Sequence, residues 1–567
     1  MRNKILIILL LLCNYLFSQT ETFPQYPNPV KIPVYLSATF AEIRSNAFHA
    51  GVDIRTQGVE GKEVFAVADG YVSRIGVSPF GYGKVLYITH NDGFTSVYAH
   101  LSKFNKNIGE YVKAKQYENE SFAQNMLLDE NEFPIKRGDF LGFTGNSGGS
   151  GGPHLHYEIR YTETQEPVNP LFFGLKIKDT MKPNIKGFAI YPLENSMVND
   201  QDEALYFNVV NENNAYSLKN PIFTANGNIA FGINVFDQAD GSPNKNGPYS
   251  IELFADNTLI YSVVSYKYSY SETRYVNSLI DYSYYIKNKE RFIRTEIDEF
   301  NKLSVYNEKN GIVSVNEGDT LNMKYVVKDY NNNVSTLCFT LIGGEKSELN
   351  KYKDMISRSC YNISGDKSSE IKVGGFEAKI PKYAFYRDVA IEATQIDTIE
   401  NIFSDYAYQL GNNEIPLHKK IKLRLKISDE FADDTLLYVA LVDKDGKFSF
   451  LGNKYIDNHI EGQTNVLGTY IIAKDAVKPT IKPLNFKGNG SITDNWSLRL
   501  EIEDEESGIN KYDMYVNGKW VLADYDAKNN LLMYQIDDHI KKGHNTLEVI
   551  VTDMLGNKCV YSTTLQR

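Results

Sequence analysis

The chain has 567 residues, 42% of them hydrophobic and 23% charged, with a formal net charge of −11. This length exceeds what one hydrophobic core supports and predicts three to four domains. The acidic balance argues against nucleic-acid binding and gives the whole chain no general attraction to an anionic cell wall. The 40 tyrosines, with frequent Asn, Ser, Val and Ile, favour strands and turns over helices.

The chain begins with a signal-peptide pattern. Two basic residues precede an apolar run over residues 5–12, and Ser18 and Gln19 mark the expected cleavage point after it. The alternative, a membrane anchor, is disfavoured because the run is too short to span a bilayer well. We therefore expect residues 1–19 to direct export and to be removed. A lipoprotein site at Cys13 is disfavoured because Leu12 before it is not a small residue.

Five of the nine histidines lie in one stretch of the N-terminal third. His49 and Asp53 are four residues apart, which places them on one face of either a strand or a helix. The glycine and β-branched residues around them favour an extended segment. His100 closes a later apolar segment. His154 and His156 alternate along a segment with strand character, so both point to the same side.

These side chains are typical of a metal site. Imidazole and carboxylate groups suit Zn²⁺, and three protein ligands with an open fourth position form the catalytic arrangement. An isolated histidine pair is most often accidental, but three such motifs together argue against that interpretation. The chain has no HExxH helix, which excludes a thermolysin-like zincin. The Gly-rich segment 145–152 lacks the Lys and Ser or Thr of a phosphate-binding loop; its small residues instead let a substrate backbone approach the metal.

Three motifs occur in order: HxxxD at 49–53, YAH at 98–100 and GPHLHYE at 152–158. Together they resemble the lysostaphin-like (LytM-type) zinc metallopeptidases, a family of peptidoglycan endopeptidases. Segments between the motifs, FAVADGYV at 65–72 and GYGKVLYITH at 81–90, resemble a strand pair and a hairpin of the same family. The resemblance covers about a quarter of the chain and implies a small antiparallel β fold for the peptidase domain.

The resemblance also implies roles for five residues. His49, Asp53 and His156 would bind one Zn²⁺, and His100 and His154 would be the catalytic histidines beside it. All five positions hold the residue type that the family uses.

Neighbouring residues leave alternatives open. His90 has no role in the family assignment and is expected at the surface. Glu158 either supports a metal-bound histidine by a hydrogen bond or forms a surface ion pair. The interval between the second and third motifs is longer than the family usually has, owing to a polar insert near Lys113–Lys136. We expect exposed loop at 119–121 and 129–132 and a helical turn at 122–128. The insert either lines the substrate groove or is a tolerated surface insertion.

The rest of the chain contains two β units that begin with similar segments and end with similar segments; we call these segments the entry and the exit. Lys178–Lys186 has a near copy at Lys474–Lys482, and the Pro in each gives an extended entry into the next strand. The segments 327–334 and 551–558 both indicate a hairpin with an acidic turn. The repeat predicts two related β units that resemble bacterial immunoglobulin-like sandwiches.

The predicted fold class is therefore mainly β, a small antiparallel β peptidase domain followed by β-sandwich modules. The expected divisions are a signal peptide (1–19), the zinc metallopeptidase domain (20–178), an elaborated Ig-like sandwich (179–345), a β-sandwich of uncertain type (346–475) and a second Ig-like sandwich (476–567).

The combined features predict an exported zinc-dependent endopeptidase that hydrolyses peptide cross-links of peptidoglycan, in the periplasm, the cell envelope or outside the cell. The expected partner is the peptidoglycan peptide stem, and the β modules would position the enzyme against wall, membrane or an envelope protein. Two alternatives stay open: a non-catalytic wall-binding regulator of other hydrolases, and a secreted metalloprotease acting on proteins. The sequence leaves open the cleaved bond, the oligomeric state, and whether Cys338 and Cys360 pair. Four further histidines are expected to be ordinary surface residues: His418, His459, His539 and His544.

Overall fold

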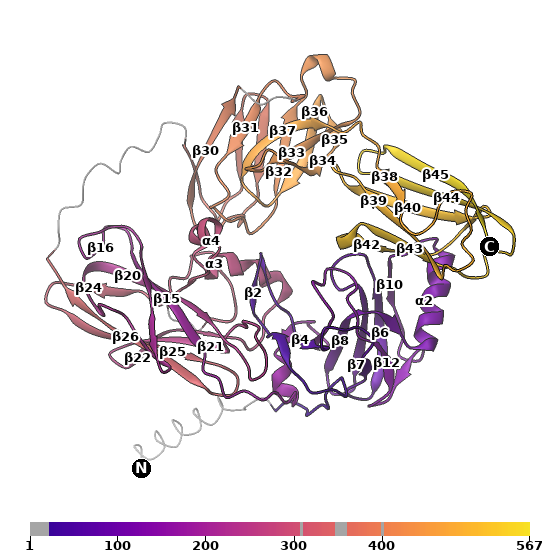
Figure 1. Ribbon diagram of the computed structural model, residues 1–567. Coiled ribbons are helices and arrows are strands. Elements are labelled where there is room, and N and C mark those ends of the chain that lie inside the picture. Colours follow the sequence, from indigo (N-terminus) through magenta and orange to yellow (C-terminus); the bar gives the residue numbers. More distant parts are fainter. Residues whose placement is uncertain (1–21, 307–309, 346–359, 398–401) are drawn as a thin grey trace, which may run out of the picture.

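Four groups of strands follow one another around a ring, and the fourth lies beside the first (Figure 1). The computed structural model describes residues 22–306, 310–345, 360–397 and 402–567, so the predicted signal peptide lies outside the described residues. Strands dominate and nearly all pair antiparallel, which confirms the mainly β fold class. Within these residues no helix is long and apolar enough to cross a membrane. We call the four groups the N-terminal, second, third and fourth units.

The N-terminal unit contains the main sheet that carries the candidate site. Strands alternate their side chains between two faces. Leu155, Tyr157 and Ile159 therefore pack into the core, while His154 and His156 take the other positions. The main path of this sheet is β1 (Leu36–Ala38), β4 (Val52–Arg55), β13 (His154–Tyr161), β8 (Phe94–Leu101), β7 (Lys84–His90), β6 (Gly70–Val77) and β10 (Gln124–Leu127). The other elements of the unit are β2 (Ile43–Arg44), β3 (Ala47–Phe48), β5 (Glu63–Phe65), β9 (Lys103–Phe104), α2 (Lys106–Glu118), β11 (Pro134–Ile135), β12 (Phe140–Phe143), β14 (Pro167–Val168) and η1 (Pro170–Phe173).

The insert of this unit has the expected loops at 119–121 and 129–132, largely exposed, but it also contains regular elements that were not expected. Asn105 caps the N-terminus of helix α2, and its side chain accepts the Ile108 N–H at 3.0 Å. Ile108 and Val112 pack into the core. Residues 124–127 form β10, paired with β6, so the predicted helical turn at 122–128 is wrong. The helix was missed because it starts before the polar stretch and has only a narrow apolar face.

The second unit consists of a ten-stranded sheet, a separate two-stranded sheet (β18 and β19) and short helices. Its elements are β15 (Asn184–Pro192), β16 (Met197–Val198), β17 (Leu205–Asn208), β18 (Val210–Glu212), β19 (Ala215–Ser217), β20 (Ile222–Phe236), β21 (Ser250–Ala255), β22 (Thr258–Val264), η2 (Tyr270–Tyr275), α3 (Val276–Leu279), α4 (Tyr282–Asn288), β23 (Ile293–Arg294), β24 (Val313–Val315), β25 (Thr320–Lys328) and β26 (Val334–Gly343). Long β20 pairs with β15 on one side and, in parallel, with β26 on the other.

The third unit packs a six-stranded sheet on a five-stranded sheet around one apolar core. Its elements are β27 (Cys360–Ile363), β28 (Ser369–Val373), β29 (Phe376–Ile380), β30 (Val389–Ile396), β31 (Ala407–Leu410), β32 (Ile421–Lys426), η4 (Asp429–Phe431), β33 (Leu437–Val442), β34 (Phe448–Gly452), β35 (Lys454–Ile456), β36 (His459–Thr464) and β37 (Gly468–Lys474).

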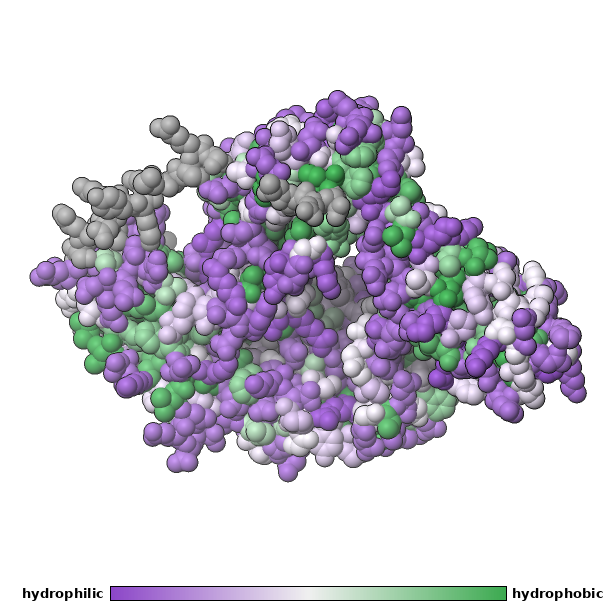
Figure 2. Space-filling model, turned by 45° about the horizontal axis from the view of Figure 1, so that its top comes forward, coloured by the Kyte–Doolittle hydropathy of each residue, from purple (hydrophilic) through white to green (hydrophobic). Residues whose placement is uncertain are grey.

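The fourth unit packs two four-stranded sheets on each other. Its elements are β38 (Thr480–Pro483), β39 (Ser497–Glu503), β40 (Ile509–Val516), β41 (Lys519–Trp520), β42 (Ala523–Asp526), η5 (Ala527–Asn529), β43 (Leu531–Gln535), β44 (His544–Asp553) and β45 (Lys558–Gln566). Cys338, Cys360 and Cys559 form no disulfide with one another in the described part of the chain. Hydrophilic side chains predominate on the face in Figure 2.

Candidate metal centre and active site

Strand pairing brings the five predicted residues together. His156 of β13 lies opposite Asp53 of β4 and opposite Ala99 of β8, so these three residues share one face of the sheet. His100 follows Ala99 with a left-handed φ of 58°, which breaks the alternation of β8 at that point. His49 directly follows β3. The register of β4 and β13 therefore places Asp53, His154 and His156 on the face away from the core, and His49 and His100 reach this patch from the ends of β3 and β8.

Three ligand atoms converge at the centre of this patch. His49 Nε2 lies 2.9 Å from His156 Nδ1 and 3.0 Å from Asp53 Oδ1, and His156 Nδ1 lies 2.8 Å from the same oxygen. All three side chains are buried. The outer ring nitrogens have acceptors, because His49 Nδ1–H donates to Thr39 O and His156 Nε2–H donates to Glu158 Oε1, both at 2.8 Å.

This arrangement fits a cation. With the outer nitrogens protonated, His49 Nε2 and His156 Nδ1 both present lone pairs, and two lone pairs 2.9 Å apart repel unless positive charge lies between them. Burial raises the pKa of Asp53, but the surrounding histidines, His49 above all, hold that pKa well below its usual range. Burial lowers the pKa of His156, yet its bonds to Asp53 and Glu158 raise it to about 9. The cluster thus favours positive charge at its centre, and its donor set is one that zinc accepts.

His100 and His154 stand beside the three convergent atoms. Their ring centroids are 4.8 Å apart, and the His100 ring lies 5.8 Å from that of His156. His100 Nδ1–H donates to Ser147 O at 2.9 Å, which leaves His100 Nε2 as an acceptor. His154 Nδ1–H donates to Gly152 O at 2.8 Å, and His154 Nε2 lies 3.4 Å from Asp53 Oδ1. Burial, with His156 and His154, lowers the pKa of His100 to about 3.

The backbone of His100 is unusual. Its φ of 58° lies in the left-handed region, which costs a residue other than glycine on the order of 1–3 kcal/mol. Such strain clusters at functional sites, where the surrounding structure over-determines the conformation.

Glu158 supports the cluster from beneath. It is fully buried, which excludes the surface ion pair and fits the hydrogen-bonding alternative. Its second oxygen accepts from Arg160 Nε at 2.7 Å and from Tyr270 Oη at 2.9 Å, and Tyr82 Oη donates to the first at 2.5 Å. Burial raises the pKa of Glu158, but Arg160 and His156 bring it down to about 2.

Two contacts were not predicted from the sequence. Arg44 Nη2, on the β2–β3 hairpin, lies 2.8 Å from Asp53 Oδ2. One oxygen of Asp53 therefore binds the hairpin, and the other faces the two histidine nitrogens. Tyr270 reaches Glu158 from the second unit. No sequence signal marks Tyr270, whereas Arg44 lies five residues before His49 and is the only charged residue between Glu42 and Asp53.

His90 was expected at the surface, and this prediction is wrong. The residue is only 4% exposed, and its ring nitrogens form hydrogen bonds with Ser96 Oγ at 2.8 Å and Asp69 O at 3.0 Å. It lies at the end of β7, two strands from β13, and its pKa is lowered by burial.

The Gly-rich loop packs against the chain's own backbone. A Cβ on Gly145 would lie 2.4 Å from Ser102 N, and one on Gly148 would lie 2.4 Å from Gly83 N. Around Gly151 and Gly152 a Cβ would meet nothing within 4 Å. Only the last two glycines therefore leave open space beside His154.

The fourth unit contacts this loop and the insert. Lys528 donates to the carbonyls of Asn146 and Gly148, the latter at 3.4 Å. On α2, Tyr117 contacts the Trp520 ring edge-on at 5.4 Å and stacks on His539 at 5.5 Å. The insert is thus a docking surface for the fourth unit.

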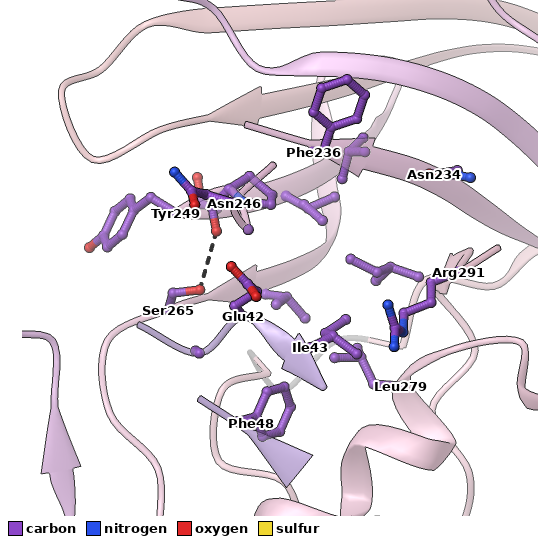
Figure 3. Close-up of a pocket in the computed structure, with 18 of the residues that line it drawn as sticks. Glu42, Ile43, Phe48, Asn234, Phe236, Asn246, Tyr249, Ser265, Leu279 and Arg291 are labelled. Atoms are coloured by element: carbon purple, nitrogen blue, oxygen red, sulfur yellow. Dashed lines mark hydrogen bonds between the residues drawn. The ribbon is translucent and has the colours of Figure 1, made fainter. Parts of the chain in front are cut away.

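A cavity of about 310 Å³ lies behind the site, between the β2–β3 hairpin and the second unit (Figure 3). Glu42 and Phe48 line one wall, and Asn246 and Arg291 lie across from them. Burial raises the pKa of Glu42 to about 7. None of the five site residues lines this cavity, so it is separate from the candidate metal centre.

Comparisons with known proteins agree with the N-terminal geometry. Residues 47–117 match peptidase family M23. The chain carries an M23 peptidase domain. The match includes His49, Asp53 and His100, whereas His154 and His156 lie beyond the insert. Residues 361–475 match the Zu5-like domain, an identity that the strand pattern of the third unit did not reveal.

Several curated relatives share this M23 domain. The DD-carboxypeptidase/endopeptidase Mpg of Neisseria meningitidis is 31% identical over 141 residues, 25% of this chain and 26% of that protein. Lysostaphin of Staphylococcus staphylolyticus is 30% identical over 115 residues, 20% of this chain and 19% of that protein. The murein hydrolase activator NlpD of Escherichia coli is 33% identical over 127 residues, 22% of this chain and 26% of that protein. The chain thus spans about a quarter of these relatives' length.

Among solved structures, the catalytic domain of the M23 protein EnpA from Enterococcus faecalis is 24% identical, covering 27% of this chain and 97% of that chain with a TM-score of 0.19.

Proposed function

We propose that this protein is an exported zinc endopeptidase that hydrolyses peptide cross-links of peptidoglycan. The observation that carries the proposal is the convergence of His49 Nε2, Asp53 Oδ1 and His156 Nδ1 within 3.0 Å of one another. The M23 match and the endopeptidase relative Mpg support the reaction class and the cell-wall substrate. In this proposal His49, Asp53 and His156 are the zinc ligands, and His100 and His154 are the catalytic residues.

Zinc bound by the three ligands would polarise the scissile carbonyl and lower the pKa of a water to about 7. His100 would accept the proton of the attacking water at Nε2, because its Nδ1–H is held by Ser147 O. His154, oriented by Gly152 O, would present its own Nε2 to the reacting groups and help return the proton to the leaving amine.

The location follows from the same proposal. Residues 1–19 would direct export, and the enzyme would act in the periplasm, the cell envelope or outside the cell. The second, third and fourth units would hold the catalytic domain against wall, membrane or an envelope protein.

The test is digestion of purified sacculi by zinc-loaded protein, with the released muropeptides identified by mass spectrometry. We expect cross-linked muropeptides to disappear with zinc present and to persist after chelation. No hydrolysis by folded, zinc-loaded protein, or undiminished hydrolysis after chelation, would overturn the proposal. Cleavage of Gly-rich peptides without cleavage of sacculi would favour the secreted protease.

A non-catalytic regulator is the second candidate. The relative NlpD is named a murein hydrolase activator, and Lys528 of the fourth unit holds the loop beside the site. A regulator would release no muropeptides alone but would increase release by an added wall hydrolase. The same sacculus assay, run with and without that hydrolase, separates the two functions.

A further inference from the structure

Two triads of aspartates lie outside the M23 domain. Asp179, Asp237 and Asp329 in the second unit each place one carboxylate oxygen within 4.8 Å of the others. Asp475, Asp504 and Asp553 do the same in the fourth unit. We call them the second-unit triad and the fourth-unit triad.

The two triads occupy equivalent places. Asp179 and Asp475 each stand four residues before the proline of the repeated entry. Asp237 follows β20, which pairs with the first strand β15, and Asp504 follows β39, which pairs with the first strand β38. Asp329 and Asp553 stand in the exit hairpins β25–β26 and β44–β45. The same arrangement of three aspartates therefore occurs twice, and in each unit three separate segments of the chain supply it.

The same hydrogen bonds hold both triads. Asn333 donates its backbone N–H to Asp329 Oδ1 at 2.8 Å, and its Nδ2 donates to Asp329 Oδ2 at 2.6 Å and to Asp179 O at 3.2 Å. In the fourth unit, Asn557 makes the three matching bonds to Asp553 and to Asp475 O at 2.9, 2.8 and 2.9 Å. Each asparagine thus links the exit hairpin to the entry segment by hydrogen bonds. These bonds hold the aspartate of the exit next to the aspartate of the entry.

The lysines that adjoin the triads in the sequence pair with other carboxylates. The adjacent lysines turn elsewhere: Lys178 pairs with Asp240 at 3.6 Å and Lys474 with Asp434 at 2.7 Å. Within the described ranges, no Lys, Arg or His side chain forms an ion pair with any of the six aspartates. Burial and the other two carboxylates raise the pKa of Asp237 to about 8. Three carboxylates this close are stable together only with a proton or a cation among them.

Unsatisfied polar atoms point independently to a missing partner. Asn246 is 3% exposed, yet neither its Oδ1 nor its Nδ2 has a hydrogen-bond partner, and Asp237 Oδ1 also has none. Asn246, Asp179 and Asp237 line one cavity of about 20 Å³, which has room for a single water or ion. Asn246 also borders the larger cavity of Figure 3.

The fourth-unit triad has a corresponding unsatisfied group. Ser507 donates its N–H to Asp475 Oδ2 at 3.2 Å, while its hydroxyl is buried and has no partner. Buried polar groups are normally hydrogen-bonded, so an orphan beside three carboxylates needs an explanation. A bound ion with its water shell provides one.

We propose that each triad binds one calcium ion. The donors are carboxylate oxygens with a neutral amide or hydroxyl nearby and no imidazole or thiolate, which suits a hard cation and not zinc. Ca²⁺ accepts the flexible, oxygen-rich geometry that three segments of loop provide, whereas Mg²⁺ demands a near-ideal octahedron and dehydrates reluctantly.

Both ions lie at junctions between units. Leu36 and Phe40 of the N-terminal unit line the cavity beside the second-unit triad. Asp475 N–H donates to Leu436 O of the third unit at 3.0 Å, and Leu555 packs against the third unit. Calcium would therefore stiffen two junctions between units. It would thereby fix the position at which the fourth unit contacts the Gly-rich loop. The proposal is independent of hydrolysis at the zinc site.

The test is calorimetric titration of CaCl₂ into the zinc-loaded protein, repeated with MgCl₂. We expect two calcium ions per chain and at least tenfold weaker binding of magnesium. Asp237→Asn should lose one ion, Asp504→Asn the other, and the double variant both. Asp445→Asn, on an exposed turn of the third unit, is the control and should keep both.

Thermal unfolding distinguishes an ion site from a structural carboxylate. Calcium should raise the Tm of wild type by binding the folded state, with a smaller rise in each single variant and none in the double variant. Without calcium the variants should melt at or above the wild-type temperature, because one of three like charges is gone. No calcium binding by wild type at millimolar concentration, or two ions retained by the double variant, would overturn the proposal. If a variant fails to fold, the number of calcium ions that the wild type binds is measured by equilibrium dialysis. Two ions per chain would support the proposal, and none would overturn it.

Discussion

His156 Nε2 donates to Glu158 Oε1 at 2.8 Å, and this bond turns Nδ1 of the same ring toward Asp53 and His49. Both residues lie on β13, two positions apart, so the strand that supplies the proposed ligand also supplies its support. A carboxylate behind a metal-bound imidazole fixes its tautomer and raises its basicity.

Glu158→Gln should weaken zinc binding by about 10- to 100-fold. The amide keeps the shape and an acceptor oxygen but loses the charge that Arg160 and His156 now share. Zinc affinity is measured by competition with a chromophoric chelator. Glu163→Gln, an exposed carboxylate in the turn after β13, is the matched control. Equal affinities for the two variants would show that Glu158 has no influence on the metal.

His49→Ala and His154→Ala should separate binding from turnover. The first removes one of the three convergent ligand atoms, so zinc should be lost together with activity. The second leaves those atoms in place, so zinc should stay while muropeptide release falls by about 10²- to 10⁴-fold. Metal content by elemental analysis and sacculus digestion are measured on the same samples. Full activity of His154→Ala would remove it from the catalytic residues.

The sequence predicted the local parts of this site because they depend on short spacings. The HxH motif sets two side chains on one face of β13, and the HxxxD motif keeps His49, just after β3, close to Asp53 of β4. Their assembly depends on β4, β13 and β8 being neighbours, a non-local register that periodicity does not specify and that only the family resemblance supplied. Tyr270 could not be predicted at all, because it reaches Glu158 from another unit.

The scattered histidines show a second reason for error. His418 and His539 were expected at the surface, but His418 stacks on Tyr275 of the second unit at 4.2 Å and His539 stacks on Tyr117. Single residues at contacts between units have no sequence period, because the partner face lies hundreds of residues away. His90 was misplaced likewise, since a strand end gives no signal of what packs above it.

Gly145→Ala should destabilise the catalytic domain, whereas Gly151→Ala should not. The added Cβ would lie 2.4 Å from Ser102 N in the first case and would meet nothing within 4 Å in the second. Backbone cannot move aside cheaply, so we expect a loss of about 1–3 kcal/mol for Gly145→Ala. Urea unfolding of both variants checks this. Similar midpoints would show that the loop relaxes freely.

The stability of the third unit should fall as the pH drops from about 6.5 to about 4. Burial, Arg274 and Lys419 lower the pKa of His418 from 6.5 to about 4. Between these values the unfolded chain binds a proton that the folded chain does not, so stability rises with pH in this window. His418→Gln should reduce the pH dependence of stability between pH 4 and 6.5. Above pH 7 its stability should vary with pH as that of the wild type does. Urea midpoints from pH 4 to 8 are the measurement, and parallel curves throughout would refute the assignment.

Tyr117 of α2 should hold the fourth unit on the N-terminal unit. It contacts Trp520 and His539 by its ring, and its hydroxyl lies 3.3 Å from Asp537 Oδ2. Aromatic pairs contribute about 0.5–1.5 kcal/mol beyond their buried area. Tyr117→Ala should therefore speed hydrogen exchange on both sides of this contact, in α2 and in residues 519–541. Tyr111→Ala, on the same helix but packed on Phe133, is the control: it should loosen α2 without loosening residues 519–541. Unchanged exchange in those residues after Tyr117→Ala would mean that other contacts, such as Lys528 on the Gly-rich loop, hold the fourth unit in place.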